Sequence, residues 1–256
     1  MIRTPVAAGT FYPAHADRLA RTVDGLLAHT EPRISFAPRA IGVPHAGYAY
    51  SGPIAASAYI LVPNAVRRVA LFGPSHFVPL TGAAVPRATA WVTPLGAVEI
   101  DGDLAAVARS KGATDDDAPH EPEHALEVQL PFLQRRIAPG FTVLPVAVGG
   151  STPAEAADLF EPLLERVDLV VVSTDLSHYL DDATAKRRDR VTADAVLGRD
   201  PEAIGSEAAC GVFALRGLVE VARRRDLEVH LLDLRTSADT AGDPGRVVGY
   251  GAFAFA

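Results

Sequence analysis

Short, unbroken apolar runs are the feature that most constrains what this chain can fold into. A strand with one face in water alternates apolar and polar residues, whereas continuous apolar runs of this length are typical of strands buried on both faces. The runs that we expect to form strands are Ala40–Val43, Arg68–Phe72, Val143–Val148, Leu169–Ser173 and Val247–Phe255. They predict a mainly parallel sheet that helices cover on both sides.

Segments with helical periodicity lie between these runs. We expect helices over Asp17–His29, Pro53–Leu61, Glu123–Arg136, Ala154–Arg166, Ala183–Leu197 and Cys210–Arg225. Pro131 must bend or interrupt the third helix, because proline lacks the amide hydrogen that a helix interior uses. Strands that alternate with helices indicate βαβ units, and alternating apolar residues over Thr89–Glu99 suggest an additional hairpin. No repeat or long linker divides the chain, so we expect one α/β domain over residues 1–256.

Composition narrows the partners and the compartment. The chain has 24 Lys and Arg against 31 Asp and Glu, a net charge of −7. This balance argues against nucleic acid or an anionic membrane as a partner, because both attract positively charged surfaces. Cys210 is the one cysteine, so no internal disulfide can form and a cytoplasmic protein is expected. We find no signal-peptide pattern and no apolar run of the ~18 residues that a membrane span needs.

Three histidines each follow one of the predicted strands. His45 comes directly after the first strand, His76 follows the second, and His178 follows the fourth. In open α/β sheets, ligands bind outside the carboxyl ends of the strands, so we expect these imidazoles to meet at one edge. Neutral imidazole is the commonest protein ligand of first-row transition metals. The positions therefore predict a shared polar site and favour a metal in it.

Three further residues have competing interpretations. His124 either belongs to the start of a helix, with Glu123 before it, or faces the cleft, and His120 is expected to be structural. Cys210 opens a predicted helix, where a small thiol usually serves packing. A helix N-terminus and a nearby cation would instead lower the pKa of Cys210 and favour the thiolate, which binds metals. From the residues alone, packing is the favoured interpretation.

Seven segments, spread over most of the chain, form a recognisable series. They are Ala7–Pro13, Pro44–Gly52, Gly73–His76, Thr93–Gly96, Glu123–Phe132, Ser173–Tyr179 and Cys210–Gly211. In these segments the chain resembles the Memo family, called AmmeMemoRadiSam system protein B in prokaryotes. Each segment alone is a modest match, but their number and order make the resemblance specific.

The resemblance implies a fold similar to that of the class III extradiol dioxygenases (LigB-like), the non-haem iron enzymes that open catechol rings. The two histidines and the cysteine that line the metal position in Memo proteins fall on His45, His76 and Cys210. The resemblance thus makes Cys210 an expected ligand. Fe(II) is the expected metal, with copper or zinc as alternatives, because a thiolate is softer than the carboxylate of the dioxygenases.

The resemblance also implies residues around the metal. His178 falls at a position similar to that of the acid/base histidine of the dioxygenases, and Asp175, near it in sequence, would orient it. Phe11 and Tyr50 match residues of the family's cleft, and His124 is expected to contact substrate with Tyr50. Several Memo proteins carry Trp where Phe11 stands, so a contact that needs an indole ring is not expected here.

Three classes of function are open at this point. The first is a non-haem iron oxidoreductase, dioxygenase-like, that acts on an unknown small substrate. The second is a non-catalytic module that handles a metal or binds a peptide in the same cleft. The third, metal-free hydrolysis with Cys210 or Ser75 as nucleophile, is the least favoured because neither residue sits in a nucleophile motif. The family's prokaryotic name further implies an AMMECR1-like protein and a radical-SAM enzyme as partners.

Overall fold

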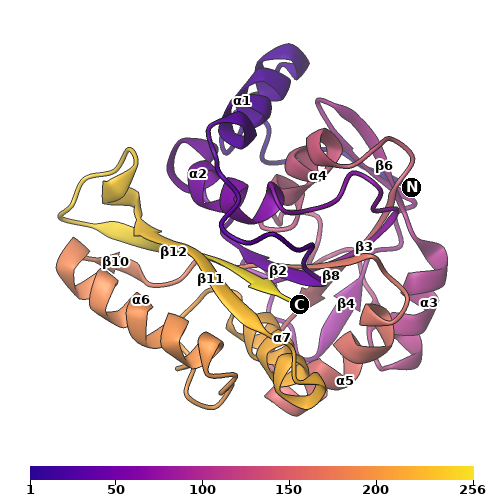
Figure 1. Ribbon diagram of the computed structural model, residues 1–256. Helices are drawn as coiled ribbons and strands as arrows, with labels where there is room; N and C mark the ends of the chain where they lie inside the picture. Colours follow the sequence, from indigo (N-terminus) through magenta and orange to yellow (C-terminus); the bar gives the residue numbers. More distant parts are fainter.

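A computed structural model describes residues 1–256, and in it one twisted sheet runs through the molecule with helices on both faces (Figure 1). The strands are β1 Ile2–Arg3, β2 Ala40–Val43, β3 Arg68–Gly73, β4 Ala83–Val85, β5 Ala90–Thr93, β6 Gly96–Ile100, β7 Thr114–Asp115, β8 Thr142–Val148, β9 Leu169–Ser173, β10 His178–Leu180, β11 Val229–Thr236 and β12 Val247–Phe255. The helices are α1 Ala16–Ala28, α2 Tyr48–Tyr59, α3 Gly102–Ser110, α4 Leu130–Arg136, α5 Pro153–Leu164, α6 Asp182–Leu197 and α7 Val212–Arg225, with 3-10 turns at Glu127–Gln129 and Ser237–Asp239.

The sheet has a parallel centre and antiparallel additions. Its strand order is β1-β5-β6-β8-β3-β9-β2-β12-β10, with β11 paired to β12 and with β4 paired to β7 and β8. The neighbours β8, β3, β9 and β2 all run parallel, whereas β12 is antiparallel to β2. The carboxyl ends of β2, β3 and β9 therefore lie side by side, which is the edge where the sequence places its candidate site.

The central strands are apolar throughout because both of their faces are covered. Along β3, Val69 and Leu71 join the core that contains the buried residues of α1, α2 and α4. Ala70 and Phe72 join the opposite core, beside α3, α5, α6 and α7. Successive side chains of a strand point to opposite faces, so each residue of the run enters one of two cores. Figure 1 shows the two helical layers above and below the sheet.

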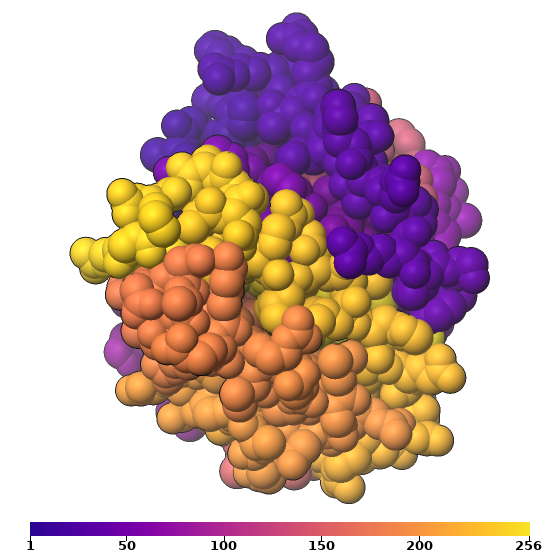
Figure 2. All heavy atoms as spheres, turned by 60° about the vertical axis from the view of Figure 1, so that its left-hand side comes forward, coloured from indigo at the N-terminus to yellow at the C-terminus, as the bar shows by residue number.

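The C-terminal hairpin closes one side of the molecule. β11 pairs antiparallel with β12 from Val229 opposite Phe255 to Thr236 opposite Gly249. Figure 2 shows this hairpin (yellow) between the region of α6 (orange) and the N-terminal region (indigo).

No helix combines the length and the apolar character that crossing a bilayer requires.

The structure confirms the fold class: an α/β domain with a mixed, mainly parallel sheet and helices on both faces, consistent with a LigB-like fold. All five predicted strands are present, and β2, β9 and β12 have the predicted bounds. The hairpin predicted over Thr89–Glu99 is formed by β5 and β6, which are antiparallel. Burial on both faces leaves a pattern in sequence that is hard to mistake, which explains this success.

All six predicted helices differ from the observed bounds, and three of them begin at least two residues away from the predicted start. α2 begins at Tyr48 rather than at Pro53, and α7 begins at Val212 rather than at Cys210. The helix expected over Glu123–Arg136 is helical only from the 3-10 turn onward, because the carboxylate of Glu123 binds backbone groups outside any helix. Pro131 does not interrupt α4, since it lies in its first turn, where a missing amide hydrogen has no cost.

Replacing Phe160 tests how strongly the layer below the sheet is packed. The rings of Phe160 and Phe72 are stacked with centroids 3.7 Å apart, and both are buried. We expect Phe160→Ala to lower the free energy of unfolding by roughly 3–5 kcal/mol, because it removes transfer energy and leaves a cavity. Urea unfolding measures the change. Val191→Ala, at an exposed position of α6, should change stability by less than about 0.5 kcal/mol; equal losses in both variants would contradict the packing argument.

Candidate metal centre

Three imidazoles meet at the predicted sheet edge, and the third of them is His124 rather than the predicted His178. His45 follows β2, His76 follows β3, and His124 precedes the helical turn before α4; one ligand nitrogen from each lies within 4.8 Å of the others. The ring centroid of His45 lies 5.2 Å from that of His76 and 5.6 Å from that of His124. The rings of His76 and His124 are stacked, with their centroids 5.0 Å apart. This arrangement can hold a metal ion, since transition metals take imidazole ligands at about 2 Å.

A buried serine fixes the proton of His45. Ser173 Oγ donates to the carbonyl of Ala125 at 2.7 Å and accepts from Gln129 Nε2 at 2.8 Å. A hydroxyl has one proton to donate, so the 3.0 Å bond between Ser173 Oγ and His45 Nδ1 is donated by the imidazole. The free lone pair of His45 is therefore on Nε2, the nitrogen that a metal would bind.

Glu123 fixes the proton of His76 on Nδ1 in the same way. Glu123 was not recognised from the sequence as a functional residue. Its carboxylate accepts the backbone N–H of His76 at 2.6 Å, the ring Nδ1 of His76 at 2.9 Å and the N–H of Ala125 at 2.9 Å. Burial alone would raise the pKa of Glu123, but these bonds hold it at about 2. The signal in the sequence was an acidic residue directly before His124, whose Nδ1 lies 3.4 Å from the same carboxylate oxygen. Carboxylates behind metal-binding histidines fix the tautomer in this way.

The imidazoles of His45 and His124 are held in the neutral form that binds metals. The pKa of His45 is lowered to about 3, by burial first and by the charge on His76 next. Burial likewise lowers the pKa of His124 to about 4, with the charge on His45 as the next cause. Both rings therefore carry lone pairs at neutral pH, as a metal site requires.

Cys210 lies beside His45 but is not one of the residues whose ligand atoms all lie within 4.8 Å of one another, which are His45, His76 and His124. Its Sγ is 3.2 Å from His45 Nε2, and the backbone N–H of Asp175 donates to the sulfur at 3.2 Å. Burial, and then the charge of Asp175, raise the pKa of the Cys210 thiol well above its usual range. The lowering expected from a helix N-terminus is outweighed by the effect of burial, and α7 begins only at Val212. The metal-free protein therefore carries a thiol here.

The other predicted residues surround this cluster. Asp175 is buried, and its carboxylate accepts the backbone N–H of His45 at 2.7 Å; burial raises its pKa, while that hydrogen bond and His178 oppose the rise. His178 opens β10 opposite Val248, and a charge on its ring would lower the pKa of His45, so it lies within electrostatic reach.

The two aromatic residues differ in their distance from the imidazoles. Phe11 stacks on His124 with ring centroids 4.2 Å apart. Tyr50 is 41% exposed on the first turn of α2, and its ring lies against Gly47. The geometry thus places Phe11 against the cluster itself, whereas Tyr50 lies beside Gly47, in the loop that follows His45.

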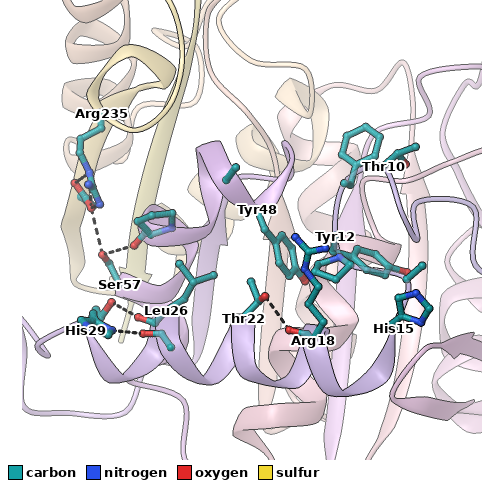
Figure 3. Close-up of a pocket in the computed structure, with 18 of the residues that line it drawn as sticks. Thr10, Tyr12, His15, Arg18, Thr22, Leu26, His29, Tyr48, Ser57 and Arg235 are labelled. Atoms are coloured by element: carbon teal, nitrogen blue, oxygen red, sulfur yellow. Dashed lines mark hydrogen bonds and ion pairs between the residues drawn. The ribbon is translucent and has the colours of Figure 1, made fainter.

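A groove of about 1280 Å³ lies outside the imidazole cluster. It runs between α1, α2 and the segment Gly9–His15, and the three clustered histidines do not line it. Figure 3 shows the side chain of Arg18 reaching from α1 toward Tyr12 and Tyr48. Phe11 contributes to this groove and also stacks on His124, so one N-terminal segment separates the groove from the candidate metal centre.

The donor set fits a first-row transition metal. Two imidazoles are held with Nε2 unprotonated, and a ligand nitrogen of the third lies within 4.8 Å of one from each of them. The sulfur of Cys210 lies 3.2 Å from His45 Nε2. Soft sulfur suits copper(I), zinc or iron, and imidazole suits iron, copper and zinc.

A helix-covered, mainly parallel sheet with an imidazole cluster at its carboxyl edge defines an α/β protein of LigB-like fold with a candidate metal centre. The chain belongs to the Memo family: the family model described as Memo-like protein matches residues 3–254. It is similar to a MEMO1 family protein of Aquifex aeolicus, with 38% identity over 97% of each chain. It is also similar to MEMO1 family proteins of Methanopyrus kandleri and Ignicoccus hospitalis, at 35% and 33% identity over 100% of this chain and 99% of theirs.

The neutral buried histidines predict a specific pH dependence of stability. Burial lowers the pKa of His45 to about 3 and those of His120 and His124 to about 4. In the unfolded chain these histidines take up protons near pH 6.5, whereas in the folded protein they do so only near pH 3 to 4. The free energy of unfolding therefore falls as the pH drops from about 6.5 to about 4. Each histidine contributes up to about 1.4 kcal/mol per pH unit. Asp175, with its raised pKa, opposes the trend by one proton at most.

Urea unfolding of the metal-free protein between about pH 7.5 and about pH 5 measures this slope. His120→Gln removes one of the three contributions and should make the dependence shallower than in the wild type. A slope that His120→Gln leaves unchanged would contradict the assignment for that residue.

Proposed function

We propose that this protein binds a transition metal, with Fe(II) as the native ion, and acts as a dioxygenase-like, non-haem iron oxidoreductase on a small substrate. The observation that carries the proposal is the imidazole cluster in which His45 and His76 each have Nδ1 bonded to a fixed partner, which leaves Nε2 as the unprotonated nitrogen. Building such a cluster requires burying polar rings and a carboxylate, which is costly without a ligand-binding role.

His45 and His76 are common to both candidate ligand sets. The family resemblance supports Cys210 as the third ligand, and the geometry supports His124, whose nitrogen lies within 4.8 Å of the other two. A bound metal favours loss of the thiol proton, so Cys210 can join the set despite its raised pKa. The metal would supply Lewis acidity and electron transfer to the site.

The chain's own residues supply binding and proton transfer in this proposal. His178 acts as general base and then as general acid, and Asp175, near it in sequence, orients it. Phe11 offers an aromatic face beside His124, and Tyr50, which is partly exposed, offers a hydroxyl to the substrate. If Cys210 is the third ligand, His124 does not bind the metal and contacts the substrate instead.

A metal-handling module is the second candidate, and one observation favours it. The sulfur of Cys210 is 3.2 Å from His45 Nε2, which gives the site a soft donor suited to copper(I) or zinc. This candidate keeps the same ligands and predicts tight metal binding without turnover.

The setting of the protein is part of the proposal. A chain with one cysteine and no internal disulfide suits the reducing cytoplasm. AMMECR1-like and radical-SAM proteins are proposed as partners on the strength of the family's name in prokaryotes. A small molecule or a peptide is the ligand class that a cleft of this kind would take.

Anaerobic reconstitution tests the metal site. We expect wild-type protein to take up about one Fe(II) per chain, and His45→Ala to lose most of this affinity because it removes a ligand from either set. Metal analysis after gel filtration measures the uptake, with His230→Ala as a control that removes a histidine outside the cluster. Equal uptake by wild type and His45→Ala would overturn the proposed centre, and uptake without O2 consumption would favour metal handling.

Cobalt(II) spectroscopy identifies the third ligand. We expect the Co(II)-loaded wild type to show a thiolate-to-metal charge-transfer band in the near ultraviolet, because a coordinating thiol loses its proton. Cys210→Ser should abolish that band and keep the visible d–d bands that the histidines produce. A wild-type spectrum without the charge-transfer band would assign the third position to His124.

A further inference from the structure

Glu127 is a fully buried carboxylate that no part of the proposed mechanism uses. It accepts a charge-assisted bond from Arg3 at 2.7 Å, the backbone N–H groups of Val6 and Ala7 at 2.8 Å each, and the hydroxyl of Tyr12 at 2.5 Å. These four donors all come from the first residues of the chain. We call this set of bonds the N-terminal clamp.

The clamp reaches the candidate metal centre through Phe11. This residue lies between Ala7 and Tyr12, both bound to Glu127, and its ring stacks on His124 at 4.2 Å. Its carbonyl accepts the N–H of Tyr48 at 2.8 Å, so it also fixes the start of α2 just beyond the loop of His45.

Arg3 ties the clamp to the segment that carries the ligands. Its guanidinium donates to the carbonyl of Glu123 at 2.6 Å and to that of His120 at 2.8 Å, besides its bond to Glu127. The same group lies 4.3 Å above the ring of Trp91, the one tryptophan of the chain. The fluorescence of Trp91 therefore reports whether the clamp is closed.

His124 is the imidazole that depends on this arrangement. Ser173 and Glu123 hold Nδ1 of His45 and of His76 at 3.0 and 2.9 Å, whereas Nδ1 of His124 is 3.4 Å from Glu123 and its ring rests on Phe11. We infer that Glu127 is a positioning residue of the metal centre, which acts through Phe11 to hold the imidazole of His124 beside the other two. This inference rests on the proposed metal-binding function.

A double-mutant cycle on Co(II) affinity tests the inference. We expect Glu127→Gln to weaken Co(II) binding roughly 10- to 100-fold, as loss of residues behind metal ligands does, and to change the fluorescence of Trp91. If Glu127 acts through His124, the double variant with His124→Ala should bind no worse than His124→Ala alone, because coupled residues are not additive. Absorption titration gives the affinities, and a purely structural role would not produce this non-additivity.

Asp101→Asn is the matched control. Asp101 is also a buried carboxylate, with bonds from Arg68, Thr142 and the N–H of Leu104, but it lies on α3's N-terminus away from the imidazoles. We expect it to lower stability and to leave Co(II) affinity within about twofold, as uncoupled sites do.

Several outcomes would overturn the inference. Unchanged Co(II) affinity in Glu127→Gln, losses that add to those of His124→Ala, or an equal loss in Asp101→Asn would each do so. If Glu127→Gln does not fold, Tyr12→Phe, which removes one bond of the clamp, decides the matter by the same cycle. A wild type that binds no Co(II) overturns the proposed function and the positioning role together, whereas binding that is indifferent to Glu127 overturns only the latter.

Discussion

The structure of the candidate centre depends on one buried carboxylate. Glu123 is removed from water, and a charge in that position is stable only because it accepts directional bonds from His76 and Ala125. The residues that provide these bonds come from the end of β3 and from the segment before α4, so satisfying one charge joins two distant parts of the chain. The imidazole of His76 is fixed as a result of the same bonds, and His124 lies next to the same oxygen. Glu123 thus fixes the position and the tautomer of His76, whereas Ser173 fixes the tautomer of His45.

The two candidate ligand sets differ in their third ligand, Cys210 or His124, and in whether that ligand must lose a proton before it binds a metal. Neutral imidazoles are ready to bind, whereas Cys210 must lose a proton that burial and Asp175 strongly favour keeping. Metal binding through Cys210 therefore releases a proton, and its strength increases with pH more steeply than binding through His124. In the metal-free protein the sulfur lies 3.2 Å from His45 Nε2, where the thiol can donate a hydrogen bond, so a metal at that nitrogen replaces this bond.

The sequence was sufficient to predict the central sheet, its two helical layers and the edge at which His45 and His76 meet. These features depend on runs buried on both faces and on the general rule for parallel sheets, and both leave a clear pattern. Glu123 was missed because an acidic residue before a helix has a common alternative use at the helix start. The clamp on Glu127 was missed because it joins residues more than 110 positions apart by backbone N–H groups, which carry no sequence signal. β11 was missed because Asp233 and Arg235 interrupt its apolar residues while pairing with each other.

The pairing of β12 with β2 has a consequence for how the molecule assembles. β12 is separated from β2 by about two hundred residues, and contacts of such separation form slowly because a long loop must first close. Gly249 of β12 accepts the N–H of Leu176 and donates to the carbonyl of Ser177, at 2.8 Å each. The stretch that carries Asp175 and His178 is joined to β12 by these two bonds, besides its bonds to His45 and Asp189. A partly folded chain can therefore have the parallel centre of the sheet, with His45 and His76 at the ends of β2 and β3, before the segment of Asp175 and His178 is attached to β12.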